Sequence, residues 1–206
     1  MKKITYQIAL ETQDDTSAVV SLVDLKKHVA IDLSETYYDD MLQSMEQAAV
    51  AYIESRARII LRNSSYEIFC DQFPDARSPL YIPLWPVRSV TDITYTDASG
   101  SVVVITNQQK SLNTQPAAMY PAVDTEWPTS QEDNRQSVTF SATVGYANNA
   151  SVPAMVKHAI KMLVAHWFRN RETVLVGSIS KELEKAVDSL MVQFRANYWT
   201  SFGVYQ

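Results

Sequence analysis

Apolar residues recur at spacings of three and four along two long stretches of the chain, and this spacing predicts two amphipathic helices. The first stretch runs from about residue 37 to residue 61, and the second begins at Pro153. Acidic residues open the first stretch and arginines close it, which complements the dipole of a helix. The apolar positions are Tyr38, Met41, Leu42, Met45, Ala49, Tyr52, Ile53 and Ile60 in the first, and Met155, Val156, Ala159, Ile160, Leu163, Val164, Trp167 and Phe168 in the second.

Two shorter helices are predicted beside them. Ser21 precedes an apolar group, and Asp24 follows it three residues later, the spacing of a capping box, which predicts a short helix through about Val29. A last helix is predicted from about Lys181, with an apolar stripe that includes Leu190. Residues 1–20 are polar and irregular, and they predict no regular element.

The middle of the chain alternates apolar and polar residues, the period of a half-buried strand. Strands are predicted over 65–73, 87–95 and 137–146. The turn residues 97–100 lead into a run of four aliphatic residues at 102–105, which predicts a hairpin. The amide-rich and polar stretch 107–136 predicts long loops.

This order of elements predicts an α+β fold that is mainly an α-helical bundle of about four helices, with a β-rich insertion between the N-terminal and C-terminal helix pairs. We expect one domain over residues 1–206. It is helical at 21–62 and 152–197 and β-rich at 65–147. A chain of this length fits one domain of ordinary size.

Composition excludes several classes of function. The net charge of −5 gives no broad basic face for phosphates, so we expect no sequence-specific nucleic-acid binding. Four scattered glycines cannot build a phosphate-cradling loop. The single cysteine, Cys70, cannot form a disulfide within the chain and suits a reducing cytoplasm. Without a long apolar stretch, no contact with a membrane is expected.

Residues that could carry chemistry do not form a recognisable set. His158 and His166 lie eight residues apart on one predicted helix, too far for a zinc-binding pair on adjacent turns. His28 has no partner that the sequence identifies. Cys70, beside Phe69 in a predicted strand, is typical of a small buried apolar residue. We therefore predict no catalytic residue, no cofactor, no metal and no enzyme activity.

Two groups of residues remain candidates for a contact surface. Lys157, Lys161, Arg169 and Arg171 lie mostly opposite the apolar stripe of the helix predicted from Pro153, where they form a solvated face or a contact surface. The chain ends in an aromatic segment that either folds back on the core or docks on a partner. Its candidate partner-binding residues are Tyr198, Trp199, Phe202 and Tyr205.

Several stretches, in this order and spacing, resemble the head–tail connector proteins of tailed bacteriophages, also called head-completion or adaptor proteins. Together they span roughly residues 20–175. They are residues 22–29, Ile31-Asp32, Asp39-Asp40, Ala48-Ala49, residues 52–54, residues 82–90, residues 93–95, Gly100, Gly145-Tyr146, residues 152–160 and residues 169–172.

The resemblance implies a structural virion protein at the neck, made in the host bacterial cytoplasm. Such proteins form a ring of about twelve copies beneath the portal protein, extend the DNA channel and meet a tail or stopper protein; the isolated chain can be a monomer. Apart from the resemblance, the segment 107–136 is long, polar and poor in helix formers, so we expect it to provide much of the reach toward a neighbouring subunit. One alternative is a tail-completion or other neck protein of the virion. A second, from a different class, is a small cytoplasmic enzyme.

Overall fold

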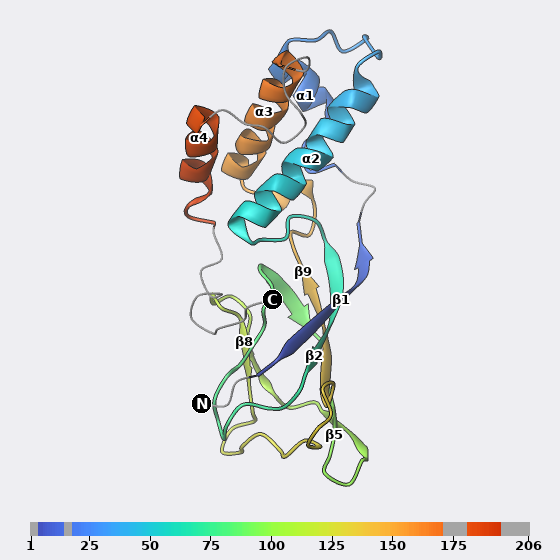
Figure 1. Cartoon of the computed structure of the whole chain (residues 1–206), viewed down its shortest axis with the longest axis vertical. Helices are drawn as coiled ribbons and strands as arrows, with labels where there is room; N and C mark the ends of the chain where they lie inside the picture. The colour runs from blue at the N-terminus through green and yellow to red at the C-terminus, as the bar shows by residue number, and fades with distance from the viewer. Residues whose placement is uncertain (1–3, 15–17, 171–180, 195–206) are drawn as a thin grey trace. The chain divides into compact units, whose positions relative to one another are not determined.

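The computed structural model describes residues 4–14, 18–170 and 181–194, which form two compact units (Figure 1). The β unit contains residues 4–13 and 63–145, and the helical unit contains residues 14, 18–62, 146–170 and 181–194. The chain therefore starts in the β unit, continues through the helical unit, returns to the β unit and enters the helical unit a second time.

The described residues form nine strands, four α-helices and one short 3₁₀ helix. The strands are β1 (Tyr6–Gln13), β2 (Ser64–Cys70), β3 (Leu80–Tyr81), β4 (Val87–Val90), β5 (Ile93–Thr96), β6 (Val102–Ile105), β7 (Gln109–Ser111), β8 (Ala118–Tyr120) and β9 (Val138–Val144). The helices are α1 (Leu22–Val29), α2 (Asp39–Ala57), η1 (Asn149–Ser151), α3 (Ala154–Arg169) and α4 (Lys181–Met191).

The larger sheet of the β unit has the strand order β1-β2-β9-β5-β6, and β4 also pairs with β9. All of its pairs are antiparallel, and β1, β2 and β9 lie side by side as its longest strands (Figure 1). A second sheet has the order β3-β8-β7. Along β9 every second residue is buried, starting at Val138, so the larger sheet has one face on the core and one toward solvent.

The β unit has its own hydrophobic core. Phe73 stacks on Trp127 with ring centroids 5.0 Å apart, and the Trp127 indole N–H donates to the carbonyl of Ser78 at 2.8 Å. Both sheets contribute fully or almost fully buried side chains, as their alternation requires. These include Ile68, Cys70, Leu80, Ile82, Ile93, Met119, Val138, Phe140 and Val144.

The core of the helical unit lies where α2 packs against α3. Residues spaced by three and four on each helix are buried, as the sequence pattern predicts. They are Leu42, Ala49, Val50 and Ile53 on α2, and Val156, Ala159, Ile160, Leu163, Val164 and Trp167 on α3. From α4, Val187 and Met191 are buried, whereas Leu190 of the predicted apolar stripe is only half-buried.

Among the described residues of the helical unit, the charged side chains of Lys26 and Glu46 are buried and make polar contacts. The Glu46 carboxylate accepts the backbone N–H groups of Val19 at 2.8 Å and Val20 at 3.2 Å, and it lies 3.8 Å from the Arg62 guanidinium. The Lys26 ammonium lies 2.6 Å from an Asp39 carboxylate oxygen. These contacts supply the partners that charges removed from water require.

The predicted helices are confirmed, with shifted ends. The Ser21 hydroxyl accepts the N–H of Asp24 at 3.1 Å, so the predicted cap of α1 is present. Helix α2 stops at Ala57, four residues before the predicted end. Arg58 adopts a left-handed conformation with φ of 55° and caps the helix by donating its N–H to the carbonyl of Glu54.

The predicted fold class needs a correction. The chain is a mixed α+β protein, and the expectation of a mainly α-helical bundle with a β-rich insertion is wrong. The nine strands of the described residues form two sheets with a separate core, and β1 comes from before the first helix. The helical stripes are regular over many residues and are easy to detect in a sequence. Strands of two to eight residues give a much weaker pattern, so the sequence favoured a mainly helical fold.

Two predicted irregular regions contain strands. Residues 6–13 form β1, because β2 offers a pairing edge that lies more than fifty residues away in the sequence. The stretch 107–136 contains β7 and β8, and its Gln108 side chain is buried. The expectation of loop structure is therefore wrong at residues 109–111 and 118–120, and the expected reach toward a neighbouring subunit stays a prediction. The single-domain boundaries stay a prediction.

We predict that Leu163→Ala lowers the free energy of unfolding by about 2–5 kcal/mol, because a fully buried leucine loses its packing and leaves a cavity. Urea denaturation followed by circular dichroism measures the change. Met155→Ala on the same helix is the control: Met155 is 40% exposed, so we expect a change within about 0.5 kcal/mol. Equal losses for both variants would contradict the assigned core face of α3.

Candidate interface surfaces

Of the side chains considered for chemistry, Cys70 lies in the β unit, and the three histidines lie in the helical unit. Cys70 is fully buried in β2, and burial raises the pKa of its thiol, which keeps it protonated. His166 lies on α3, where Asn170 donates its side-chain amide to the backbone carbonyl of His166. Among residues 4–14, 18–170 and 181–194, no group of three or more histidine, cysteine or carboxylate side chains could hold a metal ion.

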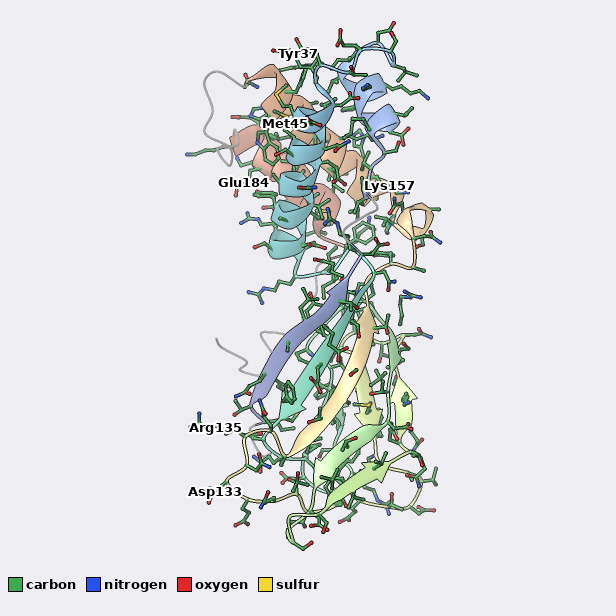
Figure 2. All side chains as sticks on the ribbon, turned by 90° about the vertical axis from the view of Figure 1, so that its right-hand side faces the viewer. Tyr37, Met45, Asp133, Arg135, Lys157 and Glu184 are labelled. Carbon is green, nitrogen blue, oxygen red and sulfur yellow. The ribbon has the colours of Figure 1, made fainter. Side chains whose placement is uncertain are left out.

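A positively charged face is present on α1 and α3. Lys157, Lys161 and Arg169 follow one another at multiples of four residues along α3, so they form a stripe about 18 Å long. Helix α3 carries no acidic residue, and Lys157 is labelled on it in Figure 2. None of the three cations makes an ion pair with a carboxylate of the described part of the chain.

Two histidines complete this basic face. The rings of His28 on α1 and His158 on α3 meet edge to face, with centroids 6.2 Å apart. The pKa of His28 is lowered from its ordinary value near 6.5, first by burial and then by the positive charges of Lys161, His158 and Arg169. We define the basic face as His28, Lys157, His158, Lys161 and Arg169; its two lysines and its arginine give a local concentration of positive charge on an acidic protein.

A shallow hollow of about 440 Å³ adjoins the basic face. Its lining includes Met162 and Ala165 from α3 and Leu183 from α4, with Arg169 at its side. An apolar centre with a polar rim is typical of a surface that contacts another protein. Lys157, Lys161 and Arg169 were predicted from the sequence as a solvated face or a contact surface. Arg171, which was predicted with them, lies outside the described residues.

The β unit exposes aliphatic side chains on β1 and β6, the two edge strands of its larger sheet. On β1, Ile8 is 38% and Leu10 is 53% exposed; on β6, Val102 is 70% and Val104 is 57% exposed. We call Ile8 with Leu10 the β1 patch, and Val102 with Val104 the β6 patch. Sequence reasoning did not single them out. The available signal was the aliphatic run at 102–105, which lacks the polar alternation of a strand exposed on one face.

A polar cleft of about 830 Å³ also lies in the β unit, between residues 71–76 and 127–135. Its floor includes the stacked rings of Phe73 and Trp127, and its rim carries Asp133 and Arg135, which are labelled in Figure 2. Neither histidine nor cysteine lines this cleft. The side chains that the cleft exposes are mainly polar, and they suit recognition of another molecule by hydrogen bonds.

The aromatic residues Tyr198, Trp199, Phe202 and Tyr205 lie outside the described residues, so their predicted role in partner binding stays a prediction. None of the helices that the structure describes has the length and apolar character required to cross a bilayer.

No protein-family model matches the chain, and no curated protein matches it at the sequence level. Solved structures do match its fold. One chain from the neck of an empty gene transfer agent particle, computed with six-fold symmetry, has a TM-score of 0.71 at 18% identity, with 92% of this chain and 95% of that chain covered. The virion of a native gene transfer agent particle contains a chain with a TM-score of 0.67 at 19% identity and the same coverage.

A third similar chain comes from the neck of the native gene transfer agent particle, computed with twelve-fold symmetry. Its TM-score is 0.59 at 18% identity, with 90% of this chain and 96% of that chain covered. The alignments span nearly all of both chains, so both units belong to the shared fold. The predicted resemblance to proteins of the head–tail junction is therefore confirmed at the level of the fold.

We predict that Lys161→Gln raises the pKa of His28 toward its ordinary value, because a nearby positive charge that disfavours the imidazolium is removed. The pKa should stay below 6.5, since burial is the larger cause of its depression. Titration of the histidine ring protons by NMR measures it. Lys27→Gln, which removes an exposed cation of α1, is the control and should leave His28 unchanged; an equal shift in both variants would contradict the basic face.

Proposed function

We propose that this chain is a structural protein of the neck of a phage-like particle, and that it forms a symmetric ring between the portal of the head and the tail. The observation that carries the proposal is the fold, which extends over nearly the whole length of chains from the neck of gene transfer agent particles. Those reconstructions have six-fold and twelve-fold symmetry. We propose twelve copies, made in the host cytoplasm and located in the neck of the virion.

The surfaces described above support an assembly role. A closed ring requires each subunit to meet its neighbours through two different surfaces, one on each side. The chain offers several exposed surfaces on two units: the basic face, the polar cleft and the two aliphatic patches. An adaptor must also contact a different protein above and below its own ring. Such a role uses many contact surfaces and requires no reaction centre.

The basic face is suited to the portal or tail side of this role, because cations without ion-pair partners among the described residues attract acidic groups of another protein. The alternative of a tail-completion protein one layer further out uses the same fold and the same ring geometry. The two differ in the protein that the ring contacts first, so binding to purified portal separates them.

We expect particles assembled without this chain to contain filled heads with portals and no attached tails. Adding the purified chain should place a ring of twelve copies on the portal, visible by cryo-electron microscopy, and restore tail attachment. Normal tails in its absence would overturn the proposal. A ring found only on tails, never on portals, would favour the tail-completion alternative.

A truncation tests the aromatic segment separately. We expect removal of residues 198–206 to weaken portal binding while leaving the melting temperature of the isolated chain unchanged, because aromatic side chains in a partner contact add affinity and no stability to the free protein. Co-sedimentation with portals and differential scanning calorimetry measure the two quantities. A drop in melting temperature without any partner would instead assign these residues to the chain's own core.

A further inference from the structure

The proposed ring needs two complementary surfaces on each copy, and the β unit carries a pair that fits this need. The β1 patch and the β6 patch lie on the two outermost strands of one sheet, separated by three strands. Four strand spacings place β1 and β6 about 19 Å apart. Among the described residues, no strand pairs with the outer edge of either.

Strand register shows that the β1 patch belongs to the inner face of the sheet. Ile8 is paired with Ile68 on β2, and Ile68 is paired with Phe140 on β9. Both Ile68 and Phe140 are buried in the core. Directly paired residues point to the same side of a sheet, so Ile8 and Leu10 continue the core face beyond the part that the rest of the unit covers.

The β6 patch belongs to the opposite face. Tyr95, whose ring meets the core residue Phe73 at 5.4 Å, is paired with Val103. Val103 therefore points inward, and its neighbours Val102 and Val104 point outward. On that outer face they lie beside half-exposed threonines of β5, whose short side chains allow another sheet to approach closely.

We propose that the β1 patch of one copy packs face to face on the β6 patch of the next copy, so that successive β units overlap around the ring. This inference rests on the proposed ring function and identifies one of its subunit contacts. The two patches lie on opposite faces and on opposite edge strands of one sheet. Each copy can therefore contact one neighbour through its β1 patch and the other neighbour through its β6 patch, as a repeated overlap requires. A single patch, or two patches on one face, would instead suit a two-fold dimer.

Hydrogen bonding of β1 to β6 of the next copy, which would make one continuous sheet, fits the ring less well. Neighbouring strands twist by about 20–25°, so five strands would rotate each copy by about 100° relative to the last. A ring of twelve allows only about 30° between neighbouring copies. A face-to-face overlap leaves the twist of each sheet within its own copy and is free of this conflict.

Each patch is small, which agrees with a contact that forms only within an assembly. Two aliphatic side chains on each side bury far less than the roughly 1,200 Å² of a stable interface. The overlap therefore adds to the contacts that already hold the copies on the portal. It excludes water from four aliphatic side chains that the isolated chain leaves exposed.

Engineered cysteines test the overlap on the portal-bound ring. The native Cys70 is fully buried and should not react. We expect the double variant Leu10→Cys with Val104→Cys, treated with a short bismaleimide, to give a ladder of covalent oligomers up to a closed ring. Each single variant should give monomers only, and a mixture of the two single variants should give dimers and nothing larger.

The control pairs Leu10→Cys with Val123→Cys, a residue of the same unit that is 72% exposed and outside both patches. It should give no ladder. A second pair, Ile8→Cys with Val102→Cys, tests an overlap that is shifted by two residues along each strand. If cryo-electron microscopy shows rings on the portal but neither test pair gives a ladder, the overlap is wrong and the proposed function stands. If no ring forms, both are wrong.

Discussion

One buried carboxylate of α2 contacts two other segments of the helical unit. Glu46 lies inside α2, yet it accepts the N–H groups of Val19 and Val20, which precede α1, and it lies near Arg62, which follows α2. Burial raises the pKa of Glu46, while the hydrogen bonds and Arg62 act in the opposite direction. Because an ionised group without such partners is costly inside a protein, the two segments are held where they satisfy it. Ser21, the cap of α1, directly follows one of them.

The sequence predicted the helices more completely than the sheets, and the reason is the range of the interactions that form each. A helix forms hydrogen bonds between residues four apart, so the spacing of apolar residues such as Ile160 and Leu163 is enough to predict it from the local sequence. Strand β1 exists only because β2 pairs with it, and its Ile8 and Leu10 remain exposed, so no local burial pattern marks it. Strands β7 and β8, of three residues each, are too short to show a period. Their omission made the fold look mainly helical.

The candidate surfaces also differ in how far the local sequence predicts them. The basic stripe of Lys157, Lys161 and Arg169 could be predicted because all three lie on one helix. Its meeting with His28 could not, since α1 and α3 are more than a hundred residues apart in the sequence. The two aliphatic patches could not be predicted as a pair either. Which face Val104 occupies follows from its pairing with Thr94, and register of this kind appears only in the folded sheet.

A chain with two complementary patches at opposite ends carries a risk, because a contact of this type forms open filaments as readily as rings. Small patches reduce that risk, since a single contact between two free copies is then too weak to persist. On a portal, the neighbours are already held close together, and the effective concentration of each patch for the next rises steeply. The same few aliphatic side chains then add useful stability. In the proposed ring, weak contacts between the edge strands would therefore add stability only where the portal has already brought the copies together.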